Sequence, residues 1–138
     1  GFFLGGRGLL AFALTVWSPA SGPRRSRGGA VLLFIAGLAL AMDSYFTTDP
    51  QTGPTTAHGI VHAFGGLFFF IAGSLGVLAV AKKFSRLRLL LTLVGILAAF
   101  ALLADSSLDA GGLAERLILL VVFTSVIVDG LSLSKSPG

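Results

Sequence analysis

Five long apolar runs, separated by short polar links, limit what this chain can fold into more than any other feature of its sequence. A helix that crosses a bilayer needs about 20 mostly apolar residues, because the hydrocarbon core is about 30 Å thick. Runs such as GLFFFIAGSLGVLAV are apolar on every face, so they lack the alternation that a membrane β-strand requires. We therefore predict a single all-α domain over residues 1–138. It would be a polytopic transmembrane helix bundle, with spanning helices over residues 1–17, 29–46, 56–81, 87–104 and 113–133.

The composition supports a membrane bundle and argues against a soluble globule. Hydrophobic residues make up 54% of the chain and charged residues 12%, against about 45–50% and about 25% in a typical soluble domain. A soluble fold with so few charges would leave large apolar patches in water. The chain has no cysteine, which excludes a disulfide, a cysteine-ligated metal and a thiol nucleophile.

Basic residues divide unequally between the two sides of a five-helix zigzag. Only Arg7 and Arg116 fall on one side, and the other Lys and Arg residues fall on the opposite side. Short loops rich in Lys and Arg stay in the cytoplasm, so we predict a cytoplasmic (inner) membrane protein with a cytoplasmic C-terminus and residue 1 outside. The net charge of +4 comes from these loops, which indicates contact with lipid headgroups rather than with nucleic acid.

Most of the acidic residues and both histidines gather at the outer ends of the predicted helices. Asp43 and Asp105 would lie near helix C-termini, where the helix dipole disfavours an anion, so each needs a compensating partner. The histidines and the two outer arginines are the available partners. The outer polar cluster that we regard as a candidate site consists of Asp43, Asp49, Thr55, His58, His62, Asp105, Glu115 and Arg116.

The sharpest motif in this cluster is the stretch of residues 55–62. We expect Thr55 to cap the start of a helix, and His58 and His62, four residues apart, then share one helix face. A hydrogen-bonded cluster of imidazoles and carboxylates is the simplest interpretation of this pattern. We therefore predict no cofactor, no bound metal and no catalytic residues. A non-catalytic role is favoured over an enzymatic one.

A metal or pigment site is the alternative. Zinc bound by His58 and His62 would need at least one further protein ligand, for which Asp43, Asp49 and Glu115 are the candidates. The internal glutamate of the H-E-x-x-H motif is missing, so the motif contains no general base of its own. A pigment magnesium or a lipid could instead contact His62, which has Gly65 and Gly66 nearby in the sequence.

Two charged residues fall within the predicted spans. Arg7 lies well inside the first helix, and an intramembrane charge is by default a functional hypothesis. We expect Arg7 to extend outward to the interface or to pair with an outer acid. Asp129, near the inner end of the last helix, is expected to be held by the neighbouring basic residues.

Small residues spaced four apart would let the second, third and fourth helices approach one another closely. These pairs are Gly37/Ala41, Gly59/Ala63, Ala72/Gly76 and Gly95/Ala99.

Three of these features together resemble a known family. They are the acidic segment at residues 43–50, the pattern T-x-x-H-G-x-x-H at residues 55–62, and Gly-x-x-Glu-Arg at residues 112–116. In these motifs the chain is similar to the small prokaryotic membrane proteins of domain-of-unknown-function family 998. The resemblance implies about six helices, one of them before Gly1, and it implies no activity.

Two classes of function follow from the sequence. We expect a non-catalytic accessory subunit that packs against other integral membrane subunits of a larger assembly, such as a respiratory or photosynthetic complex. The alternative is a small metal-dependent membrane hydrolase or transporter that uses the outer His, Asp and Glu residues. A hydrolase would need a water-accessible cavity and a third ligand, whereas a subunit would need a dry contact with another chain.

Overall fold

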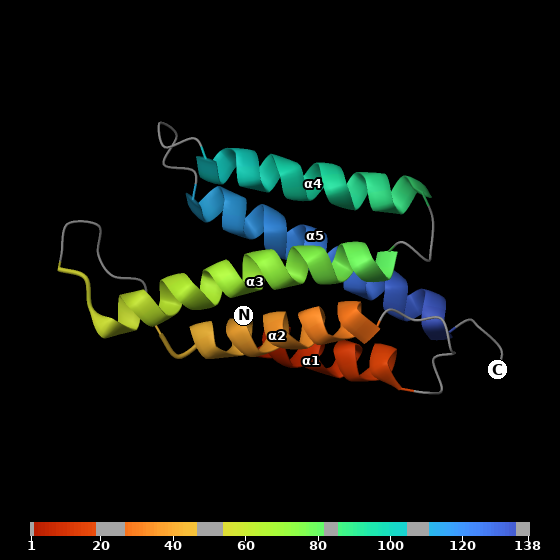
Figure 1. Ribbon diagram of the computed structural model, residues 1–138, viewed down its shortest axis with the longest axis horizontal. Coiled ribbons are helices and arrows are strands. Elements are labelled where there is room, and N and C mark those ends of the chain that lie inside the picture. The colour runs from red at the N-terminus through yellow and green to blue at the C-terminus, as the bar shows by residue number, and fades with distance from the viewer. Residues whose placement is uncertain (1, 19–26, 47–53, 82–85, 105–110, 135–138) are drawn as a thin grey trace.

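The computed structural model describes residues 2–18, 27–46, 54–81, 86–104 and 111–134, and their regular structure is entirely α-helical. The helices alternate in direction, so that α2 and α4 end where α3 and α5 begin (Figure 1). This end of the bundle is called the outer end below, after the predicted topology. The five helices are α1 (Phe2–Trp17), α2 (Arg27–Asp43), α3 (Ala57–Ala81), α4 (Arg86–Ala104) and α5 (Gly111–Ser134).

The helix bounds lie close to the predicted ones, and the largest difference is at the end of α2. This helix ends at Asp43, three residues before the predicted end at residue 46. The backbone N–H groups of Ser44 and Tyr45 donate to carbonyls three residues earlier, at 3.3 and 3.0 Å. Such bonds tighten the last turn of a helix and terminate it.

The start of α3 is capped one residue later than the sequence suggested. The Oγ1 atom of Thr56 accepts a hydrogen bond from the backbone N–H of Gly59 at 3.2 Å. The carbonyl of Thr56 also accepts the N–H of Ile60 at 3.0 Å. Thr56 is therefore the N-cap, and the prediction that Thr55 caps this helix is wrong by one residue.

Glycines set the closest helix contacts, although not always between the expected helices. A Cβ atom on Gly6 of α1 would lie 2.7 Å from both the backbone N of Ala41 and the carbonyl O of Gly37. Gly37 therefore faces α1, and not α3 or α4 as the small-residue pattern had suggested. Gly76 of α3 does meet α2, because its Cβ would lie 2.8 Å from the Leu33 side chain.

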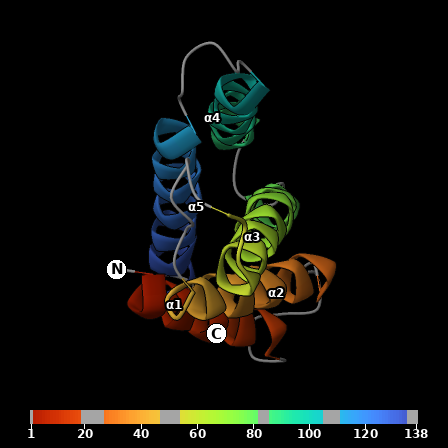
Figure 2. The ribbon, with the colours of Figure 1, turned by 90° about the vertical axis from the view of Figure 1, so that its left-hand side faces the viewer.

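The buried core lies mainly among α1, α2, α3 and α5, which contribute Leu9, Leu33, Phe69 and Ile118 as fully or almost fully buried side chains. Helix α4 adds Ile96 and Ala99 to this core. Helix α4 lies at the edge of the bundle, on the side opposite α1 (Figure 2). Only 17% of the most apolar stretch of α4 is buried, against 44% for α3. Most of the α4 surface is therefore not covered by the described part of this chain.

Two helices, α3 and α4, are long and apolar enough to cross a membrane. Helices α1 and α2 have only 16 and 17 residues. Helix α5 has 24 residues but contains Glu115, Arg116 and Asp129. The described part of the chain is thus all-helical with two candidate membrane spans, and the prediction of five spans is not confirmed by helix length and composition.

Candidate functional site

The outer end of the bundle contains a pocket of about 330 Å³ between α2, α3, α4 and α5. Its polar groups come from three helices: Asp43 is the last residue of α2, His62 lies in the second turn of α3, and Glu115 lies near the start of α5. The remaining lining is apolar and consists of Ala63, Gly66, Leu67, Phe70 and Leu103.

The Asp43 carboxylate and the His62 imidazole face each other inside this pocket. Their Oδ1 and Nδ1 atoms are 3.8 Å apart, which is an ion-pair separation but too long for a hydrogen bond. The side chains are 5% and 20% exposed. Both atoms are buried, and neither has a hydrogen-bond partner among the described residues. A buried carboxylate without a hydrogen bond is costly, so this arrangement requires an explanation.

A glycine on α3 makes room for the carboxylate. A Cβ atom built on Gly65 would overlap Oδ1 of Asp43, whereas a Cβ on Gly66 would lie 3.8 Å from Oδ2, an ordinary contact distance. Asp43 therefore lies directly against the α3 backbone at Gly65.

Three of the eight predicted cluster residues converge at the pocket, and the other described ones do not. His58 is exposed, and its ring lies 5.3 Å from that of Phe46. Thr55 and Arg116 are also exposed. Asp49 and Asp105 lie outside the described residues. The two histidines share a helix, but His62 lines the pocket and His58 does not.

The described part of the chain offers no ready metal site. Among its His, Asp and Glu side chains, no three lie close enough together to hold a metal ion. Zinc on His58 and His62 with Asp43 or Glu115 as third ligand is therefore not assembled in this structure. A site completed by Asp49 falls outside the described residues, and the absence of a cofactor stays a prediction.

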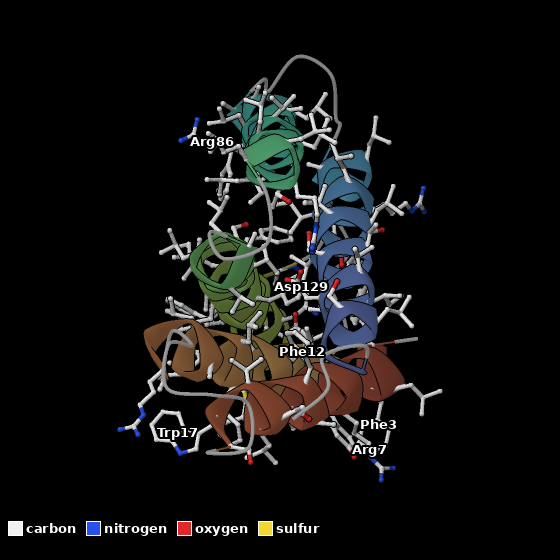
Figure 3. All side chains as sticks on the ribbon, turned by 90° about the vertical axis from the view of Figure 1, so that its right-hand side faces the viewer. Phe3, Arg7, Phe12, Trp17, Arg86 and Asp129 are labelled. Carbon is white, nitrogen blue, oxygen red and sulfur yellow. The ribbon has the colours of Figure 1, made fainter. Side chains whose placement is uncertain are left out.

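Arg7 extends away from the bundle rather than into it (Figure 3). Its Cζ atom lies 5.6 Å from the ring centroid of Phe3, one turn nearer the outer end. Phe3 in turn makes an edge-to-face contact with Tyr45, with centroids 6.1 Å apart. The described residues show no ion pair between Arg7 and an acid, and the extension of Arg7 to the membrane interface stays a prediction.

A second polar cluster, which we call the α4–α5 ladder, joins these two helices near the opposite end. Arg88 forms an ion pair with Asp129, whose side chain is only 1% exposed. One turn further along, the hydroxyls of Thr92 and Ser125 are 3.3 Å apart. Asp129 points into the bundle (Figure 3). The expected basic partner is thus Arg88, which belongs to the first turn of α4.

The sequence contains a signal for this ladder that the search for histidines and acids passed over. Arg88 and Thr92 are four residues apart, as are Ser125 and Asp129, so each pair occupies one helix face. Two such faces on antiparallel neighbours bring both pairs into contact.

Comparisons with known proteins give one positive result. No curated protein and no solved structure matches the chain. A family described as "Protein of unknown function (DUF998)" matches residues 1–132 of the 138 residues. This match covers almost the whole chain, including the acidic end of α2, the histidines of α3 and the start of α5. The chain therefore belongs to the DUF998 family.

Proposed function

We propose that this chain is a multi-pass protein of the inner membrane and a non-catalytic accessory subunit of a larger membrane assembly. All five helices cross the bilayer in this proposal, with residue 1 outside and the C-terminus in the cytoplasm. The observation that carries the proposal is an uncovered apolar face on α4. This face consists of Leu87, Leu90, Leu91, Val94 and Leu97, each more than half exposed.

The spacing of these residues places them on one side of α4, because residues three, four and seven apart share a helix face. Membrane helices gain no hydrophobic free energy by leaving lipid for one another, so a stable contact depends on close packing. A continuous row of Leu and Val offers such packing to a helix of another subunit.

Aromatic and basic residues at both ends of α1 support a spanning role for the shorter helices. At the outer end, Arg7 and Tyr45 flank Phe3. At the other end, the Cζ atom of Arg27 lies 5.9 Å from the ring centroid of Trp17. Trp and Tyr are enriched at the two interfaces of a bilayer. Phe3 and Trp17 lie about 21 Å apart along the axis of α1.

A native gel of membranes with and without this chain tests the accessory role. We expect deletion to weaken or reshape a larger complex while leaving its own chemistry largely intact. Replacing Leu90 and Leu97 by Gln should release the chain from that complex. Ile127→Gln is the matched control, because Ile127 is equally exposed but lies on α5. A chain that runs only as a free monomer, with no assembly changed by its deletion, would contradict the proposal.

A small membrane enzyme or transporter is the second candidate, and the pocket at Asp43, His62 and Glu115 is the observation that favours it. Metal analysis of the purified protein separates the hydrolase from the other functions. Stoichiometric zinc that is lost in the His58→Ala/His62→Ala double variant would support a metal-dependent hydrolase. We expect the metal content to be nil, since the described residues offer no set of three ligands.

A further inference from the structure

The outer pocket contains more negative than positive charge. Asp43 and Glu115 both line it, and His62 is the only basic side chain among the described residues that line it. Only 5% of the Asp43 side chain is exposed. Its Oδ1 atom accepts no hydrogen bond from the described residues. A buried carboxylate needs a counter-charge, and an imidazole 3.8 Å away is a weak one.

The volume of the pocket and its lining residues restrict which ligand can supply a positive charge to the Asp43 carboxylate. A volume of about 330 Å³ is at the lower end of the range of small-molecule sites, roughly 300–1,000 Å³. A bare metal ion fits poorly, because the described acids and histidines do not form a set of three ligands. The apolar lining by Leu67, Phe70 and Leu103 instead suits a ligand with a hydrocarbon part.

We propose that this pocket binds an organic cation with a primary ammonium group and an apolar body. The ammonium group lies between Asp43 and Glu115 and donates hydrogen bonds to their carboxylates, for which it has three N–H donors. The apolar body lies against Leu67 and Phe70. This binding role goes beyond the accessory function and does not depend on it.

Two sources offer this chemistry. A free alkylamine presents a primary ammonium group on a hydrocarbon chain, and so does the ethanolamine headgroup of a lipid. The pocket lies at an end of the bundle, where lipid headgroups meet the helices in the proposed membrane arrangement. The test must therefore separate a lipid from a free amine.

Thermal unfolding of the full chain in detergent measures the binding. Hexylammonium should raise the midpoint temperature in a saturable way, whereas hexanol and hexanoate should not, because they lack the positive charge. In Glu115→Gln the apparent affinity for hexylammonium should fall about tenfold or more, since a charge-assisted hydrogen bond is lost. Arg116→Gln is the matched control, because the adjacent Arg116 is exposed and does not line the pocket.

The Glu115→Gln variant should fold like the parent, because Glu115 is partly exposed and Gln has the same shape. A loss of binding in this variant therefore reports on the pocket and not on folding. Asp43→Asn gives the stronger loss of binding if it folds. Equal shifts with hexanol and hexylammonium would overturn the proposal, and so would full affinity in Glu115→Gln.

Nanodiscs then identify the source. If the lipid is the occupant, hexylammonium should bind more weakly in phosphatidylethanolamine discs than in phosphatidylcholine discs, because the choline headgroup has no N–H donor. Equal binding in both discs assigns the site to a free amine. No saturable response in either disc overturns the proposal.

Discussion

The Asp43 carboxylate can lie against α3 only because residue 65 has no side chain. Its Oδ1 atom occupies the space that a Cβ at this position would need. The neighbouring Gly66 has no such constraint, since its Cβ would lie 3.8 Å from Oδ2. Two adjacent glycines of the same helix thus have different roles, and only the first one fixes the geometry of the pocket.

The substitution Gly65→Ala should destabilise the protein by about 1–3 kcal/mol, because the new methyl group forces the carboxylate and the helices apart. Gly66→Ala should be neutral or stabilise by up to about 1 kcal/mol, because alanine favours the helix more than glycine does. SDS-induced unfolding in mixed micelles measures both changes. Equal effects at the two positions would show that the contact between Asp43 and Gly65 is not tight.

Part of the candidate site was predictable from the sequence at the level of single residues. Asp43, His62 and Glu115 were expected together because all three fall at the outer end of the bundle, at the end of α2 and near the starts of α3 and α5. The sequence could not separate His62 from His58. Four residues advance a helix by about 40° beyond a full turn and by about 6 Å, and that difference decides which ring reaches the pocket.

At the level of elements, the α4–α5 ladder holds the peripheral helix to the bundle. The ion pair between Arg88 and Asp129 and the hydroxyl contact between Thr92 and Ser125 lie one turn apart. Close packing adds to them, since a Cβ on Gly95 would lie 2.6 Å from the Val121 side chain. Helix α4 therefore depends mainly on α5 for its position.

Replacing Arg88 by Met should cost about 3–5 kcal/mol, because the almost fully buried Asp129 carboxylate loses the cation that it contacts. The double variant Arg88→Met/Asp129→Leu should recover most of this loss, since it removes both charges. Arg86→Met, at an exposed position two residues earlier, is the control and should stay within about 0.5 kcal/mol of the parent. The free energy of unfolding of each variant, measured in micelles, tests this prediction. A double variant as unstable as Arg88→Met would contradict the pairing of Arg88 with Asp129.

The sequence indicated where the helices lie but not which helices touch. Apolar runs bounded by polar links place every helix to within three residues. The contact of Gly6 with Gly37 was not predicted, because small residues four apart recur throughout a chain with 19 glycines. Such a pattern allows close approach and does not identify the partner.

At the level of the whole molecule, the up-and-down order of the helices separates two chemically different ends (Figure 1). The pocket with Asp43 and Glu115 lies at the end where α3 and α5 begin. The basic residues Arg27, Arg86 and Arg88 belong to the first turns of α2 and α4, at the other end. The proposed orientation rests on this distribution of charge.

Single-cysteine labelling tests that orientation, and the chain offers a clean background because it contains no cysteine. Tyr45→Cys, between α2 and α3, should react with an impermeant maleimide on intact spheroplasts. Ser85→Cys, between α3 and α4, should react only after the membrane is permeabilised. The reverse labelling pattern would invert the topology without changing the helix bundle.

The unequal lengths of the helices have a consequence for the surrounding lipid. Helix α2 covers about 26 Å along its axis and α3 about 38 Å, while the hydrocarbon core is about 30 Å thick. In the proposed membrane arrangement, α3 must tilt or project its first turn, with His58, into the headgroup layer. The shorter α2 instead draws the two leaflets together beside it, so that the bilayer is thinner on one flank of the protein than on the other.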